Sequence, residues 1–521
     1  FTMSDFFRFG GGMRRAMSGS GTSFNFTSGA GGIGFMGMQN NQAQEIISKF
    51  GSVNYSFSPK PTLDISGFAI ASDSETELLN RSSVTYNKTG LNESNETATL
   101  QGSRSAMLKF GTTYRPSSDV HITYDVIGKI SEQTEFNDVS SLNRGAVDTN
   151  KEEKPVSLNQ NFNWYYTGKE NSVFATELQY LYEKSQPLYN SMAESQPFMI
   201  IPASNAEQLY NLYQNKKTST HKLDAKFDYY YLLTKKSNIN LTLGATISRQ
   251  NFDTSIEQEL DNGSFVRFSD PVLNNDAKYS FNDWLLGVHY KMVSGIFTFN
   301  PGLTLHYYSL NDKQLGSENK QNLTKLLPEV YASLQFKSSE SLRFNYSIST
   351  QFSDINRVAE GYVLGSYNSL SRGDRNIEEG LRHRYSLNYF SFSMFSFTNI
   401  HASVNYTKSL NNVSSSSELI GVDLISFPIN SEFANESLAG SFRYGKTYKH
   451  LKTNFSTNIS HAIFNNIVND EKIKSKSLTH SYQGSVSTKF KKAPNFKLGY
   501  QKSFTDYSKT GSSTDRPFGD I

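Results

Sequence analysis

A run of glycines near the start of the chain is the first candidate for chemistry. GAGGIG at 29–34 matches the pattern G-x-G-x-x-G, in which glycines let the backbone approach a pyrophosphate. A dinucleotide site also needs a strand before the glycines, a helix after them and an acidic residue ~20 positions further on. The following residues, GFMGMQNNQAQ, lead into a strand pattern instead. Residues 1–41 are therefore predicted to be a Gly-rich flexible loop, and no cofactor is expected.

Histidine, serine and aspartate form no catalytic or metal-binding pattern. The nine His residues never stand at metal-ligand spacing, and H-E-x-x-H does not occur. Ser, His and Asp are common but lack a nucleophile elbow. The chain has no Cys, which excludes disulfides and thiolate chemistry, and its formal charge of +3 does not predict a nucleic-acid partner. We predict no catalytic residues, no metal site and no enzyme.

The elements that carry the polar residues are strands. In HKLDAKFDYYYL, residues 221–232, Leu223, Phe227 and Tyr231 alternate with charged residues. A strand here places apolar groups on one face and the charges on the other. A soluble sandwich and a membrane barrel both give this pattern. No run approaches the ~18 to 20 apolar residues of a spanning helix, so a membrane interpretation requires a barrel.

The pattern recurs along the chain and predicts roughly eighteen strands between about 42 and 507. Short connections alternate strictly with long polar ones. The short connections are SPKP (58–61), RPSSD (115–119), TGKENS (167–172), TKKSN (234–238), MVSG (292–295), KSSES (337–341), MFSF (394–397), YKHL (448–451) and KKAPN (491–495). The long ones are 74–98, 134–152, 185–219, 252–277, 309–322, 353–379, 409–433 and 465–478.

This alternation favours a large antiparallel transmembrane β-barrel over a soluble multi-sheet protein. Such barrels have short periplasmic turns at one rim and long extracellular loops at the other. The 30 Tyr and 38 Phe would supply aromatic girdles at the two interfaces. Many of the predicted strands are longer than the ~9 to 11 residues that cross lipid, so the sheet is expected to project beyond the outer surface of the membrane. We predict an outer-membrane barrel over 42–521, preceded by the loop 1–41 on the extracellular side.

One internal segment resembles a signature of the TonB-dependent receptors. It is SDINRVAEGYVLGSYNSLSRGDRNIEEGLRHRYSLNYFSF, residues 353–393. Gly373 to Gly380 resembles a G-N-P-x-L-x-P-E element, without its prolines, with Asp374 in place of Asn and Gly380 in place of Glu. Residues 1–15, 52–69, 493–507 and 514–521 are similar to outer-membrane β-barrel proteins of Bacteroidota. The resemblance runs nearly end to end.

The resemblance implies several features of the whole protein. Relatives carry a signal peptide, a regulatory-like domain, a plug and first strands before the point where this chain starts, and further strands after its end. The barrel would then close at ~22 strands with a plugged lumen. We expect a fragment of such a barrel in the bacterial outer membrane, surrounded by outer-membrane lipid.

Three hypotheses for function follow. The first is a TonB-dependent transporter that imports a scarce ligand captured by extracellular loops at 185–219, 353–379 and 409–433, energised by a TonB-type protein if a plug exists. The second is a non-transporting barrel that scaffolds a complex with surface lipoproteins or other outer-membrane subunits. The departures around Gly373 favour it. The third is a passive pore, if no plug exists. Charged residues expected to line the lumen are Asp224, Lys226, Asp228, Arg343 and Arg443.

Overall fold

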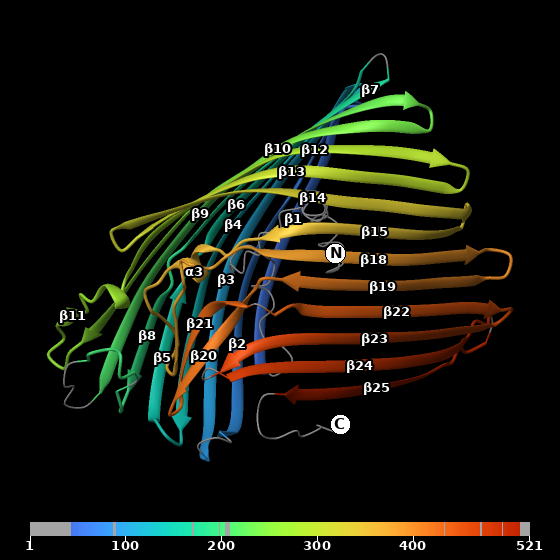
Figure 1. Ribbon diagram of the computed structural model, residues 1–521. Helices are drawn as coiled ribbons and strands as arrows, with labels where there is room; N and C mark the ends of the chain where they lie inside the picture. Colours follow the sequence, from blue (N-terminus) through green and yellow to red (C-terminus); the bar gives the residue numbers. More distant parts are fainter. Residues whose placement is uncertain are drawn as a thin grey trace.

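The computed structural model describes residues 43–86, 90–168, 171–196, 198–203, 209–431, 433–468, 471–491 and 493–510 (Figure 1). The predicted loop 1–41 lies outside these residues. The main strands are β1 (Ala43–Lys60), β2 (Leu63–Tyr86), β3 (Leu91–Ser117), β4 (Val120–Ser141), β6 (Val156–Thr167), β7 (Ser172–Ser185), β9 (Tyr210–Thr234), β10 (Ser237–Glu259), β12 (Asn275–Ser294), β13 (Phe297–Gln314), β14 (Ser317–Lys337), β15 (Glu340–Gln351), β18 (Gly380–Ser393), β19 (Thr398–Leu410), β22 (Asn435–Tyr448), β23 (Leu451–Val468), β24 (Glu471–Thr488) and β25 (Lys497–Thr510).

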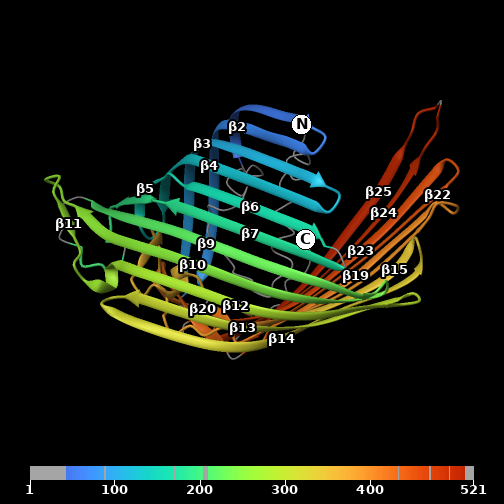
Figure 2. The same cartoon turned by 90° about the horizontal axis from the view of Figure 1, so that it is seen from above.

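In the part of the chain that the structure describes, these eighteen strands form one antiparallel ladder, each paired with the next. The predicted strand number and pairing are therefore confirmed. Figure 2 shows the sheet curling so that β1–β2 and β24–β25 form its two ends. Closure at ~22 strands stays a prediction. No helix among the described residues is long and apolar enough to cross a membrane.

The predicted short connections that lie wholly within the described residues join consecutive strands at one end of the sheet. The turn after β9, for example, joins Thr234 directly to Ser237, and the turn after β12 joins Ser294 to Phe297. Short elements are found at the opposite end: β5 (Gly145–Glu153), β8 (Leu188–Ala193), β11 (Phe265–Arg267), η2 (Pro271–Leu273), α3 (Ile355–Val358), β16 (Val363–Ser366), β17 (Ser369–Ser371), β20 (Asn412–Ile420) and β21 (Asp423–Ser431). The expected asymmetry between the two rims is present.

Four of the predicted long connections are wrong as loops, because the strands continue through them. In 74–98, β2 and β3 pair up to Tyr86 opposite Leu91, and in 309–322 Gln314 pairs with Ser317. The same extension occurs in 134–152 and 465–478. Outside the lipid neither face of a strand must be apolar, so the alternation disappears while the backbone ladder continues. β3, with 27 residues, fits the expected projection beyond the membrane.

The two faces of β9 differ as the sequence predicted. Leu223, Phe227 and Tyr231 are each at least a third exposed on the outer face, whereas Asp228 is 2% exposed on the inner face. Neighbouring strands continue both faces, because Phe227 pairs with Leu243 and Asp228 pairs with Thr242. Continuous backbone pairing from strand to strand, with an apolar outer surface, is what lipid requires of a spanning sheet.

Aromatic side chains gather on the outer face near each rim. Near the turns, Trp164 stacks on Tyr166, with the ring centroids 6.0 Å apart. Towards the other rim, the rings of Tyr182 and His221 lie 4.8 Å apart. Amphipathic rings are stable at the headgroup level. The two groups match the girdles that the aromatic composition predicts, and histidine shares the outer one with tyrosine.

Candidate ligand site

A segment that we term the strap, residues 353–379, folds back onto the inner face of the sheet at the rim opposite the turns. It contains α3, β16 and β17 (Figure 1). Asp354 caps α3 by accepting a hydrogen bond from the backbone N–H of Arg357, at 3.3 Å. β17 pairs in parallel with β21. The predicted long loop 353–379 is therefore an ordered part of the barrel interior.

Four amide side chains of the wall bind the strap backbone. Gln214 of β9 accepts from Leu364 N at 2.7 Å and donates to Leu364 O at 3.2 Å. Asn275 of β12 does the same with Gly361, at 2.8 and 3.1 Å.

The other two amides continue this row on β10 and β13. Gln250 accepts from Ile355 N at 3.1 Å, while Gln314 accepts from Glu360 N and donates to Val358 O, both at 3.0 Å. Each hydrogen bond adds about 1 kcal/mol net to the stability of the folded strap, and leaving a buried donor or acceptor unpaired costs ~1–3 kcal/mol.

Two apolar clusters fix the strap more firmly. Ile355, Val358 and Ala359 pack in one cluster of buried residues with Phe252, Ala277, Tyr279, Phe281, Tyr308 and Phe352. Tyr362, Leu364 and Leu370 pack in the other with Phe198, Ile201, Leu212, Ile256, Phe268, Leu273 and Ile425. A fully buried large apolar side chain contributes ~1.5–3 kcal/mol relative to an exposed one. Lifting the strap would expose several at once.

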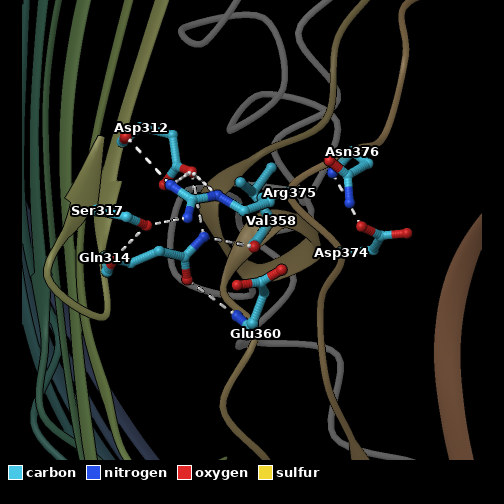
Figure 3. A network of polar contacts seen from close by, with 8 residues as sticks. All are labelled: Asp312, Gln314, Ser317, Val358, Glu360, Asp374, Arg375 and Asn376. Carbon is cyan, nitrogen blue, oxygen red and sulfur yellow. Dashed lines mark hydrogen bonds and ion pairs between the residues drawn. The ribbon is translucent and has the colours of Figure 1, made fainter. Parts of the chain in front are cut away.

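The element that resembled the receptor signature locks the end of the strap (Figure 3). Arg375 donates from Nε to Asp312 Oδ2 at 2.9 Å, and its Nη2 lies 2.7 Å from the same oxygen. Gly373 N donates to Ala359 O at 2.6 Å. A Cβ at Gly373 would lie 2.5 Å from that oxygen, so this contact requires glycine. Asn376 N closes a turn onto Asp374 Oδ1 at 2.8 Å.

A polar cavity of about 790 Å³ lies between the strap and the wall of β3 to β10. From the strap come Asp354, Ile355, Asn356, Val363, Leu364, Gly365, Ser366, Tyr367 and Ser371. The wall contributes Thr97, Gln133, Glu135, Asn137, Val139, Thr149, Lys151, Glu153, Glu183, Lys184, Ser185, Pro187, Tyr189, Gln214, Lys216, Thr218, Thr220, Gln250 and Asn251. Two of the three loops predicted to contact a ligand, 185–219 and 353–379, thus meet here. The third, 409–433, pairs with the strap instead.

Uncharged partners already bind two of the cavity's carboxylates. Glu135 accepts from Gln101 at 2.9 Å and from Asn137 at 3.1 Å, and Ser185 donates to Glu153 at 2.6 Å. The Lys216 ammonium lies 5.2 Å from the centroid of the Phe252 ring, and burial lowers the pKa of this lysine. The cavity thus offers hydroxyl, amide and ammonium groups. Among the described residues no group of His, Cys, Asp and Glu is placed to hold a metal ion.

Three of the five predicted lumen residues lie on the inner face of β9, in two separate ion pairs, Lys226 with Asp228 and Asp224 with Lys222. Lys226 Nζ lies 3.0 Å from Asp228 Oδ2, and Thr242 donates to Asp228 at 2.5 Å. Asp224 accepts from Thr246 at 2.6 Å. Lys226 also lines a second cavity, of about 690 Å³, nearer the turns. A role for these residues in a transport path stays a prediction.

The other two predicted residues lie elsewhere on the same face of the sheet. Arg343 stands on β15 opposite Ser333 and Asn388. Arg443 stands on β22 opposite His401 and Ser456. Both side chains are exposed. The structure does not bring either arginine to the ion pairs on β9.

Sequence reasoning missed the four wall amides. In an amphipathic strand any inward Gln or Asn fits the polar face, so nothing marks Gln214 or Asn275 as ligands of a backbone far along the chain. Gln214 and Leu364 are 150 residues apart. Only the folded sheet brings them together.

Comparisons with known proteins agree with this architecture. Residues 167–520 match the "Outer membrane protein beta-barrel family". Among solved structures, the copper transporter OprC aligns with a TM-score of 0.50 at 10% identity, over 90% of this chain and 73% of its own. The outer membrane transporter YddB from Escherichia coli gives 0.48 at 8%, over 89% and 69%. The hemophore receptor HasR of Serratia marcescens gives 0.47 at 10%, over 89% and 76%.

No curated protein sequence matches the chain. The fold is that of a large antiparallel barrel, like that of the copper transporter OprC, and a Bacteroidota origin stays a prediction. Because the family match covers more than half of the chain, the chain belongs to the outer membrane protein β-barrel family, and its place is the bacterial outer membrane.

Proposed function

We propose that the protein imports a scarce ligand across the outer membrane, with the cavity between the strap and β3 to β10 as the capture site. The observation that carries this proposal is the cavity itself. It lies at the rim opposite the turns and combines about 790 Å³ with a polar lining. Pockets of ~300–1,000 Å³ are typical of small-molecule sites. Transport would be driven by a TonB-type protein acting on a plug, and it involves no catalysis.

The scaffold alternative was favoured by the departures from the family pattern around Gly373. Those departures suggested that the element had degenerated. In the structure Gly373, Asp374 and Arg375 each hold the strap. The element has a structural role in this sequence, so its departures from the family pattern do not argue against transport.

The test compares solutes that cells remove from their medium. Cells with the native protein are compared with cells that lack it and with cells carrying Thr97→Trp, which places a bulky ring into the cavity lining. Ser83→Trp, in an exposed extension of β2, is the matched control. We expect at least one solute to be depleted only by the native and Ser83→Trp cells, and only while the inner membrane is energised. If all four strains deplete the same solutes, the import proposal fails.

A further inference from the structure

We infer that the strap is a fixed partition of the barrel mouth, so that the ligand of the proposed site is a small hydrophilic molecule no larger than the cavity beside it. This inference rests on the proposed function, because it assumes that the cavity binds a ligand. Its structural part, that an immobile strap sets the size of the cavity, is argued from the contacts alone. A folded protein or a long polymer would need the strap to move.

The first step is that the strap is bound to the wall along its length. The wall amides span four strands: Gln214 on β9, Gln250 on β10, Asn275 on β12 and Gln314 on β13. They bind the backbone at successive points from Ile355 to Leu364. A loop that opens and closes exchanges such hydrogen bonds for hydrogen bonds with water, but the four wall amides are only 2–5% exposed. Opening would break a row of buried hydrogen bonds together.

The second step is that both ends of the strap are locked independently. At one end Ile355 and Val358 are buried against Phe252 and Tyr308. At the other, Lys325 Nζ lies 2.8 Å from Glu379, and Asn430 Oδ1 accepts from Glu378 N at 2.8 Å.

Close backbone approach adds to this, because a Cβ at Gly361 would lie 2.3 Å from Asn274 O. Among the described contacts of the strap, there is therefore no segment free of its surroundings that could act as a hinge.

The third step concerns the chemistry of the ligand. The lining carries many hydroxyl, amide and charged side chains beside a smaller set of apolar residues, which are Val139, Pro187, Ile355, Val363 and Leu364. A molecule that binds here exchanges hydrogen bonds with water for hydrogen bonds with these groups. The class that fits is a small, hydrogen-bonding solute with both donors and acceptors. An apolar ligand would leave the cavity's polar groups unpaired.

The test measures which reagents reach the cavity from outside intact cells. The native chain has no Cys, so a single cysteine reports one position. Thr218→Cys places a thiol in the cavity lining. Leu142→Cys, at the turn between β4 and β5, is the control, because the native Leu142 is 66% exposed. Each is labelled with N-ethylmaleimide and with a maleimide carried on a long polyethylene glycol.

We expect N-ethylmaleimide to label both thiols and the polymer reagent to label Thr218→Cys at least ~100-fold more slowly than Leu142→Cys, as for an open state populated below ~1%. Adding Gln214→Ala and Asn275→Ala should raise the polymer reagent's rate at Thr218→Cys. Gln314→Ala alone is the milder variant if the double change prevents folding, which heat-modifiable gel migration reports.

Two outcomes overturn the inference. Equal polymer labelling of Thr218→Cys and Leu142→Cys in the otherwise native chain would mean that the strap yields. Exclusion of the polymer that persists after the wall amides are removed from a folded barrel would mean that something other than the strap limits the cavity. Labelling measures only whether reagents reach the cavity, whereas solute depletion measures import. A labelling result that overturns the fixed strap is therefore distinct from a depletion result that overturns the proposed function.

Discussion

At the scale of single residues, the interior of this barrel is organised by polar side chains that bind specific partners. Asp312 and Arg375 are 7% and 15% exposed, so their ion pair is largely shielded from water. Lys313 and Glu318, beside it on the same hairpin, are 56% and 37% exposed. A charge buried with its partner becomes costly when the partner is removed, whereas an exposed pair contributes little.

Asp312→Asn should therefore loosen the strap. Loss of the carboxylate leaves the Arg375 guanidinium without its counter-charge, at a cost of about 3 kcal/mol. Hydrogen exchange of the Gly373 and Asp374 amides, which donate to strap carbonyls, should accelerate. Glu318→Gln, with a cost below ~1 kcal/mol, should leave it unchanged. Equal exchange in both variants would show that the Arg375 contact does not hold the strap.

The Asp423 carboxyl gives a pH dependence. It pairs with Arg144 and is 11% exposed, and burial raises its pKa from 3.8 despite the opposing effect of the guanidinium. A carboxyl with a raised folded pKa binds its proton more tightly in the folded state. Its contribution to stability is thus greatest in acid and is lost as pH rises through the folded pKa.

The thermal midpoint of the native protein, relative to that of Asp423→Asn, should rise as the pH falls towards 3.8. A difference between the two midpoints that stays constant with pH, or that shrinks in acid, would contradict this assignment. Unfolding monitored at several pH values in one detergent makes the comparison.

At the scale of elements, the strap behaves as an additional layer laid on the inner wall. Its backbone runs close to the wall at Gly361 and close to itself at Gly373, where a Cβ would lie 2.3 and 2.5 Å from carbonyl oxygens. Gly365 in the same strap is different, because its Cβ would meet the Ser369 hydroxyl at 3.2 Å. A rotatable side chain yields more easily than a backbone carbonyl.

Gly361→Ala should therefore destabilise the strap by ~1–3 kcal/mol, the usual cost of forcing extra volume into a packed site. Limited chymotrypsin digestion, which cuts after aromatic residues once they become accessible, would report the loosened strap as faster cleavage at Tyr362, which is buried in the native protein. Gly365→Ala is the matched control and should be cut at nearly the native rate. Faster cleavage of the control than of Gly361→Ala would refute the packing explanation.

At the scale of the whole molecule, the sheet must satisfy lipid on its outer face and water on its inner face. Leu243 of β10 is 56% exposed on the outer face, between Phe227 and Leu286. Asn319 of β14 lies on an exposed strand extension beyond the apolar band. The same charged substitution should be costly at Leu243 and nearly neutral at Asn319, because only Leu243 faces hydrocarbon.

Leu243→Lys should cost ~2–4 kcal/mol if this residue lies near the middle of the bilayer. Reversible unfolding of the barrel in lipid vesicles would measure that difference. Asn319→Lys should stay within about 0.5 kcal/mol of the native protein. Similar costs at both sites would mean that the apolar band is not the lipid contact.

The sequence by itself determined the large antiparallel barrel, its eighteen consecutive strands and the rim that carries the turns. These follow from a two-residue period and from turn residues, which are local properties of the chain. Alternation also placed Asp224 and Asp228 on the inner face. Only the tertiary structure decided that four of the eight predicted long polar connections are strand, since water removes the need for an apolar face.

Tertiary structure also decided that 353–379 is a strap and that Gln214 and Asn275 hold it. Those amides and the strap are far apart in the chain. A contact between distant segments produces no periodic pattern in the sequence of either segment, so the sequence does not predict it.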